Sequence, residues 1–174
     1  MLAVTEGGWR LMFIRFVTTG GTIDKIYFDA NSQFEVGESP VKNILAEGLV
    51  SFDYDIVPMF QKDSLEITEE NRQALKEFIE NDDAGFYVVT HGTDTMVETA
   101  AILSSIADKT IVLTGSLSPA RFKSSDAVFN IGMAVAAVQA AKPGVYIVMN
   151  GQVFAEGEVV KNRAANRFEK IEND

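Results

Sequence analysis

Five apolar runs rich in Val, Ile and Phe, several of them separated by stretches of helical periodicity, constrain the fold of this chain most strongly. The runs cover residues 12–18, 54–60, 86–90, 110–114 and 144–149. Apolar side chains repeat with a helical period over residues 67–81, 95–107 and 126–141. Strands that alternate with helices predict an α/β fold of three layers, a mainly parallel sheet with helices on both faces. We expect Thr68 to cap the first of these helices, and the third, which is apolar almost all round, to be the most buried.

The composition fits one domain and argues against a nucleic-acid partner. At 174 residues the chain is long enough for one sizeable core and short for two. We therefore expect a single domain over 1–174, in which residues 1–11 are an extended start or an addition to it. The 25 acidic residues outnumber the 15 basic ones, which gives a formal charge of -10, and the basic residues do not cluster. The chain lacks the basic footprint that a phosphate backbone requires.

Metal, cofactor and membrane roles are disfavoured as well. The chain has no Cys and a single His, which excludes thiolate nucleophiles and argues against a metal site, so we expect neither metal nor cofactor. The apolar segment 11–17 is too short to span a membrane, is interrupted by Arg15 and precedes no small-residue cleavage site. We expect no membrane partner and a cytoplasmic location. Any nucleophile must then be a hydroxyl, an amine or a carboxylate.

Polar loops follow the predicted strands. In sheets of this kind, ligands bind beyond the carboxyl ends of the strands. The segments TTGGTID, QKDS, THGTDT and TGSLSP, and the tail after VYIVMNG, all occupy such positions, so we expect one crevice to collect them. Residues 19–40 are long and weakly periodic, which is typical of functional or mobile loops.

The turns TGGT (19–22) and HGTDT (91–95) carry candidate hydroxyls and a carboxylate. The paired Gly of TGGT let the backbone approach a ligand, although a plain turn explains them equally well, and nucleotide-binding signatures are incomplete. In HGTDT, N-capping of a helix by Thr93 or Asp94 explains one residue and leaves the others. A carboxylate beside a hydroxyl can orient a base or accept a substrate ammonium group. His91 is predicted to be a structural hydrogen-bonding residue.

A hydroxyl nucleophile needs a neighbouring group that takes its proton. Lys161, in the polar tail after the last strand, and Tyr27, in the long loop, are the candidates. A Lys beside Asp94 suits that task. The alternatives are a solvated surface cation for Lys161 and a partly buried loop aromatic for Tyr27.

Four segments, in order, resemble the bacterial-type L-asparaginase/glutaminase family. They are TTGGTI, THGTDTMVETA, TGSLSPARFKSSDAVFN and VMNGQVFAEGEVVKN. The likeness runs from about Phe13 to about Phe168, and the asparaginase-like subunit of tRNA-dependent amidotransferases is a relative. The resemblance implies the fold of the family's N-terminal domain. It also implies hydrolysis of the side-chain amide of asparagine, or of a related small amide, through a Thr nucleophile.

The resemblance also implies a role for each matching residue. Thr22 matches the nucleophile, whereas Thr93, Asp94 and Lys161 match a Thr-Lys-Asp relay whose Asp also holds the substrate's α-amino group. Loop FQKDSL lies where the family grips the α-carboxylate, and a backbone carbonyl near TGSL matches one that contacts the amide. The implied substrate-binding residues are Lys62, Asp63, Ser64, Gly92, Gly115 and Ser116.

Two departures from the family pattern bear on activity. Phe34 aligns with the family's loop Tyr, so Tyr27 becomes the candidate hydroxyl for proton transfer. The family's smaller C-terminal domain, which helps to close the site, has no counterpart here, so we expect a more open and wetter pocket.

Three functions follow from these patterns. The first is a minimal single-domain amidohydrolase of asparaginase type, and the alternative is a weakly active or non-catalytic module that binds an amino acid or similar small ligand. The third is a domain that acts through assembly with another chain. We expect a homo-oligomer, a dimer or higher.

Overall fold

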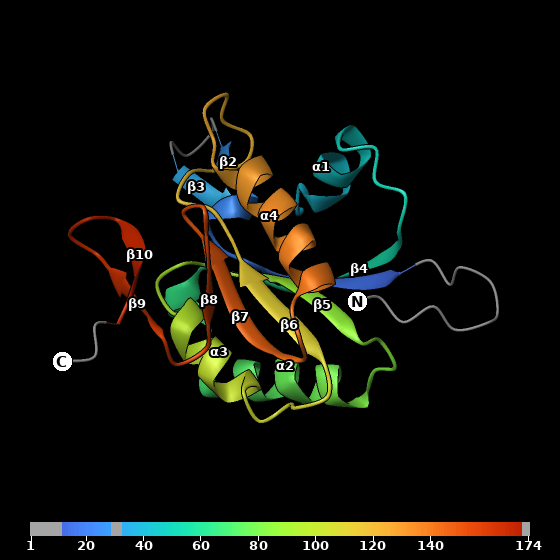
Figure 1. Ribbon diagram of the computed structural model, residues 1–174. Helices are drawn as coiled ribbons and strands as arrows, with labels where there is room; N and C mark the ends of the chain where they lie inside the picture. Colours follow the sequence, from blue (N-terminus) through green and yellow to red (C-terminus); the bar gives the residue numbers. More distant parts are fainter. Residues whose placement is uncertain (1–11, 29–32, 172–174) are drawn as a thin grey trace.

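One six-stranded sheet forms the centre of the molecule, and it contains all five strands that the sequence predicts. The computed structural model describes residues 12–28 and 33–171, apart from the side chains of residues 27, 28 and 33–35. The predicted strands are β1 (Phe13–Gly20), β4 (Asp53–Lys62), β5 (Phe86–Thr90), β6 (Thr110–Thr114) and β7 (Gly144–Met149). They run parallel in the order β4-β1-β5-β6-β7, and β8 (Gln152–Ala155) adds an antiparallel edge (Figure 1).

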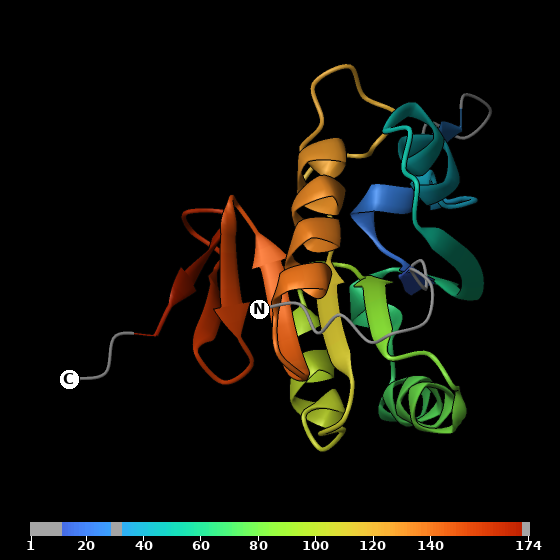
Figure 2. The same cartoon turned by 45° about the vertical axis from the view of Figure 1, so that its right-hand side comes forward.

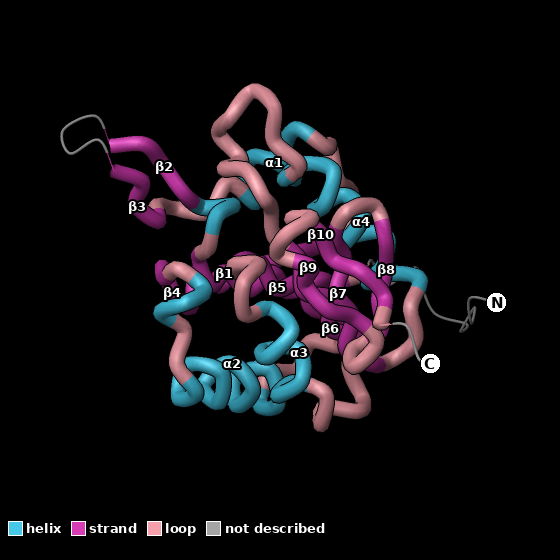
Figure 3. The backbone as a smooth tube through the Cα atoms, turned by 90° about the vertical axis from the view of Figure 1, so that its left-hand side faces the viewer, coloured by secondary structure: helices cyan, strands magenta, loops and turns pink. Residues whose placement is uncertain are grey.

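Helices cover both faces of the sheet, which confirms the predicted three-layer α/β fold. Looking along the strands, α2 (Glu69–Asn81) and α3 (Met96–Leu103) lie on one side, and α1 (Val41–Glu47) and α4 (Ala127–Ala140) on the other (Figure 3). Two hydrophobic cores result, one for each face. The first joins buried residues of α2 and α3 to the sheet, and includes Leu75, Ile79, Met96, Leu103, Val89 and Leu113. The second joins α1 and α4 to the opposite face, and includes Val41, Leu45, Ile131, Val138, Phe16 and Val112.

The helices confirm one sequence prediction and overturn another. Thr68 caps α2 as expected, because its hydroxyl accepts from the Asn71 amide at 3.3 Å while the Asn71 side chain accepts from the Thr68 amide at 3.2 Å. The prediction that α4 is the most buried helix is wrong, because six of its 14 residues are buried, against four of the eight in α3. Val128 and Phe129 of α4 are 57% and 60% exposed. A helix in an outer layer buries one face only, and apolar composition does not say whether its other face is covered.

Two hairpins extend the sheet's loops. Within the segment predicted as a long loop, the 3₁₀ turn η1 (Thr22–Asp24) leads into the antiparallel pair β2 (Lys25–Phe28) and β3 (Gln33–Val36). The second hairpin, β9 (Val159–Asn162) and β10 (Arg167–Lys170), stands beside the β7–β8 edge (Figure 2). Val159 and Phe168 fasten it, since both are buried in the core on the α3 face. Among the described helices, none is long and apolar enough to cross a bilayer.

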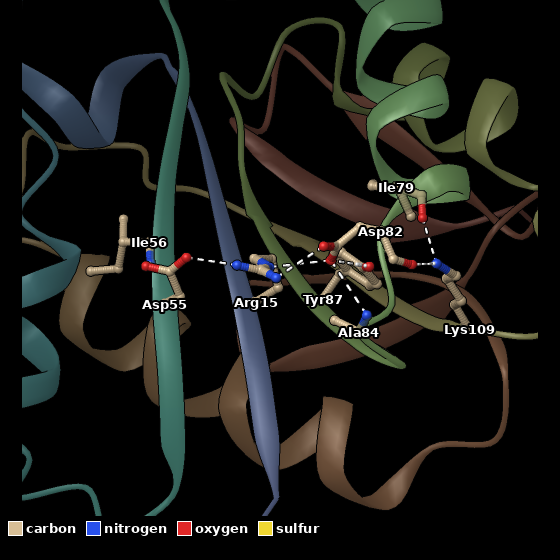
Figure 4. Close-up of polar contacts among 8 residues, drawn as sticks. All are labelled: Arg15, Asp55, Ile56, Ile79, Asp82, Ala84, Tyr87 and Lys109. Carbon is tan, nitrogen blue, oxygen red and sulfur yellow. Dashed lines mark hydrogen bonds and ion pairs between the residues drawn. The ribbon is translucent and has the colours of Figure 1, made fainter.

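A polar network joins the amino ends of β1, β4 and β5, at the edge of the sheet opposite the TGGT and HGTDT turns (Figure 4). Arg15 of β1 donates to Asp55 of β4 at 2.6 Å and to Asp82, after α2, at 2.9 Å. The Tyr87 hydroxyl of β5 donates to Asp82 at 2.6 Å. Lys109, only 7% exposed, donates to the Ile79 carbonyl at 2.5 Å and to the Asp82 carbonyl, so a cation closes the carboxyl end of α2.

Candidate active site

The TGGT and HGTDT turns touch each other at their glycines. Gly20 and Gly21 have φ of 97° and 85°, a region that side chains disfavour, and the Gly21 amide donates to the Lys62 carbonyl at 2.8 Å. A Cβ on Gly21 would lie 2.5 Å from the Gly92 Cα, so only glycine permits this approach. Thr22 and Thr93 each follow one of these glycines, and the backbone contact therefore places the two threonines on adjoining turns.

Helix α3 begins at Met96, one residue later than capping by Asp94 requires and two later than capping by Thr93 requires. Its N-cap is Thr95, and the Thr95 hydroxyl donates to the Ser64 carbonyl at 2.8 Å rather than capping the helix. Neither Thr93 nor Asp94 is the N-cap, so the interpretation of HGTDT as simple helix capping is wrong. Both side chains are left for other contacts.

Lys161 supplies those contacts. From β9, its Nζ donates to Thr93 Oγ1 at 2.7 Å and to Asp94 Oδ1 at 2.6 Å. The Lys161 side chain is 10% exposed and Asp94 38%, whereas Thr93 is 6% exposed. The alternative of a solvated surface cation is therefore wrong for Lys161. A hydroxyl, an ammonium group and a carboxylate lie in direct contact, and the carboxylate is open to solvent and to a ligand.

His91 is part of the scaffold beneath this cluster, in agreement with the sequence prediction. It is fully buried, Nδ1 donates to the Gly92 carbonyl at 2.8 Å, and Nε2 accepts from the Thr99 hydroxyl at 2.9 Å. Arg72 Nε in turn donates to the Thr99 hydroxyl at 3.1 Å. Burial lowers the pKa of His91 to about 4, with the Gly92 hydrogen bond acting in the opposite direction. A neutral imidazole therefore fixes the backbone just before Thr93.

Most of the FQKDSL loop is engaged in structural contacts. Asp63 caps the 3₁₀ turn η2 (Ser64–Glu66), and its carboxylate pairs with Lys25 at 2.7 Å. The hydrogen bond from Lys25 lowers the pKa of Asp63. Lys62 donates to the Asn71 side chain at 2.8 Å. Ser64 is buried against Gly92, where an added Cβ would lie 2.5 Å from the Ser64 Cβ. Ser64 therefore contacts the HGTDT turn directly.

The TGSLSP loop is held by two residues that the sequence did not single out. Asp126 accepts from the Leu117 amide at 3.0 Å and from the Ser118 amide at 3.1 Å. Asn130 of α4 donates to the Gly115 carbonyl at 2.9 Å. Ser116 is buried and donates to the Ser118 carbonyl at 2.5 Å. Gly115 packs on the His91 carbonyl, which brings this loop against the HGTDT turn. Asp126 is the N-cap of α4 and Asn130 lies in its first turn. Their hydrogen bonds to residues 115–118 depend on how the loop folds back onto the helix, which the sequence does not indicate.

Tyr27 and Phe34 are Cα partners across the β2–β3 ladder. Their side chains lie outside the described part of the structure, so the role of Tyr27 stays a prediction. Among the described residues, no group of three or more His, Cys, Asp or Glu could hold a metal ion.

The chain is similar to known asparaginases along most of its length. A family model described as asparaginase, N-terminal matches residues 13–173. An L-asparaginase of Bacillus licheniformis is 34% identical over 171 residues, which is 88% of this chain and 51% of that protein. The thermostable L-asparaginase from Thermococcus kodakarensis superposes with a TM-score of 0.79 at 26% identity, over 94% of this chain and 52% of that one.

A probable cytoplasmic L-asparaginase from Campylobacter jejuni gives a TM-score of 0.73 at 28% identity, over 91% of this chain and 51% of that one. Such relatives match almost the whole of this chain. The chain in turn spans about half the length of the curated relatives that it matches along most of its length.

Proposed function

Since the chain belongs to the asparaginase family, whose N-terminal model matches nearly all of it, we propose that it is an amidohydrolase that cleaves the side-chain amide of asparagine or a related small amide. The observation that carries the proposal is the contact of Lys161 with both Thr93 and Asp94. Nucleophile, proton carrier and charged partner are the components that acyl transfer needs.

In the proposed reaction, Thr22 Oγ attacks the amide carbon and the C–N bond breaks. The proton from Thr22 passes to the leaving nitrogen, which departs as ammonia, and water then cleaves the acyl ester and restores the hydroxyl. Thr93 and Lys161 carry protons in these steps, with Tyr27 as the further candidate near Thr22. The exposed carboxylate of Asp94 accepts the substrate's α-ammonium group.

The surrounding loops would hold the rest of the substrate. Ser64, with Lys62 and Asp63 beside it, is our candidate for the α-carboxylate, and Gly92, Gly115 and Ser116 for the reacting amide. Support comes from packing, since Ser64 lies against Gly92 and Gly115 against the His91 carbonyl. No metal or cofactor takes part in the proposed reaction.

Ammonia release from L-asparagine, L-glutamine and a panel of small amides tests the proposal. Wild type should exceed Thr22→Ala and Thr93→Ala by about a hundredfold or more, because each variant lacks a reacting or proton-carrying hydroxyl. Ser105→Ala, which removes an exposed hydroxyl after α3, is the matched control and should match wild type. If wild type releases no more ammonia than the Thr variants, the proposal fails. Thermal stabilisation by L-aspartate without turnover would then favour a ligand-binding module.

We also infer a homo-oligomer in the cytoplasm. Support for assembly comes from apolar side chains on neighbouring surface elements, since Val128 and Phe129 of α4 and Val153 of β8 are about half exposed or more. Sedimentation velocity should show a dimer or higher species that Phe129→Lys weakens, and a monomer at micromolar concentration would refute the inference. Cell fractionation tests the location, for which the likeness to the Campylobacter jejuni protein is the support.

A further inference from the structure

A cavity of about 300 Å³ lies behind the TGGT turn. Its walls come from β1, from η1, from the loop before α1 and the start of that helix, and from the edge strand β4. The lining includes Thr18, Asp24, Ser39, Lys42, Ile56 and Pro58. The cavity has room for a molecule of several heavy atoms, because one water occupies about 30 Å³ of liquid.

Asp24 is the unusual group in this wall. It is 3% exposed, and neither Asp24 Oδ1 nor the buried Ser39 Oγ has a hydrogen-bond partner among the residues that the structure describes. Buried polar atoms are nearly always paired, and a donor that enters the cavity could reach both Asp24 Oδ1 and the neighbouring Ser39 Oγ, which have no partner of good hydrogen-bond geometry. Burial raises the pKa of Asp24 to about 7, while the nearby Ser39 hydroxyl and Gly20 amide lower it by less.

The other groups around the cavity define the chemistry of that partner. Asp24, the Ser39 and Thr18 hydroxyls and the carboxylate of Glu38 offer acceptors, which suit a cation rich in N–H donors. Lys42 is the single cation in the lining, and the residues from β1 and β4 bring no charge. A ligand with an ammonium group at one end and a carboxylate at the other can pair with both the carboxylates and the Lys42 cation of the lining.

We propose that this cavity is a second small-molecule site, in which Asp24 and Ser39 bind a primary ammonium group and Lys42 pairs with the carboxylate of a small amino acid. Ile56 and Pro58 give the ligand a short apolar wall, which favours glycine-sized or alanine-sized side chains. The site does not depend on the amidohydrolase proposal. It communicates with Thr22 directly, because Thr22 and Asp24 are the two ends of the η1 turn.

Titration of the full chain, followed by amide chemical shifts in NMR spectra, tests the proposal. The Asp94→Asn variant serves as background, because it removes the other carboxylate that accepts an ammonium group. The probes are glycine, methylammonium chloride and ammonium chloride, each against sodium chloride at equal ionic strength. We expect saturable shifts at Gly20, Asp24 and Ser39. Affinity for glycine should be up to about tenfold weaker near pH 6 than near pH 8, because binding requires ionised Asp24.

Variants identify the groups that bind. Adding Asp24→Asn should weaken the affinity for every probe by about tenfold or more, since a charge-assisted hydrogen bond is lost. Asp108→Asn makes the same change at an exposed position before β6 and should have no effect. Lys42→Met should weaken the binding of glycine and leave the binding of methylammonium unchanged. If Lys42→Met binds all probes as tightly as its background, the ligand is an ammonium ion or simple amine, and the amino-acid part of the proposal is wrong. The whole proposal is overturned if no probe saturates, or if Asp24→Asn binds as tightly as its background.

Discussion

Asp24 should make the protein less stable as the pH rises through neutrality. In the unfolded chain an Asp ionises near 3.8, whereas burial raises its pKa in the folded protein to about 7. Between these values the unfolded state binds fewer protons than the folded state, so the free energy of unfolding falls with increasing pH. The stabilisation is complete below the lower pKa and is lost as the pH passes the higher one.

The size of the effect follows from the shift. One pKa unit corresponds to about 1.4 kcal/mol, so ionisation of Asp24 should lower the free energy of unfolding by about 2 kcal/mol between about pH 5.5 and about pH 8.5. Little discount for solvent screening is needed at 3% exposure. His91 acts in the opposite direction, because its pKa is lowered to about 4 and its contribution to stability is lost as the pH falls below its unfolded value. Comparison of two variants that both retain His91 removes that contribution.

Asp24→Asn keeps the shape of the side chain and cannot ionise. We expect wild type to lose about 2 kcal/mol of unfolding free energy relative to Asp24→Asn over this range, equivalent to roughly 4–8 °C in Tm. Urea unfolding at both pH values provides the measurement, and the range stays above the isoelectric point of about 4.6. Asp108→Asn is the control and should follow wild type. Parallel pH profiles for wild type and Asp24→Asn would show that Asp24 is not buried as an acid, and the reasoning would fail.

Three further changes test the packing and electrostatics around the site. Gly92→Ala should cost about 2 kcal/mol or more in urea unfolding, because its Cβ would meet Ser64 at 2.5 Å and the Gly21 turn cannot move away freely. Lys109→Met should lower the free energy of unfolding by about 2 kcal/mol, since two carbonyls at the end of α2 lose their cation; an unchanged urea midpoint would contradict this role. His91 should show an NMR titration midpoint near 4 rather than above 6, and a midpoint in the ordinary range would mean that the imidazole is solvated.

The strands and the clustered loops were predictable because each depends on local patterns. The apolar runs became β1, β4, β5, β6 and β7, and strand ends in a parallel sheet share one edge, so TGGT and HGTDT had to lie near each other. The exposure of Val128 and Phe129 was not predictable. Residues on both sides of α4 are apolar, and only the layer order decides which of them meet the sheet.

Contacts between segments distant in the sequence were not predictable either. Sequence position suggested that Lys161 could serve the site, but its contact with Thr93 and Asp94 depends on the β9–β10 hairpin, which carries weak periodicity. The cavity beside Asp24 was not predictable, because the composition of a polar segment does not indicate which single Asp is buried. The resemblance implied that Lys62 and Asp63 bind substrate, whereas the structure shows both in local hydrogen bonds and ion pairs.

The position of Lys161 also sets the moment at which the site is complete during synthesis. Thr22, Thr93 and Asp94 are translated early, but their cation lies 67 residues beyond Asp94 and is anchored by Phe168. A growing chain on the ribosome can therefore form most of the parallel sheet while its polar cluster still lacks a cation. Only when the β9–β10 hairpin leaves the exit tunnel and docks do the hydroxyl, ammonium and carboxylate groups come together, so the site is completed after the parallel sheet has been translated.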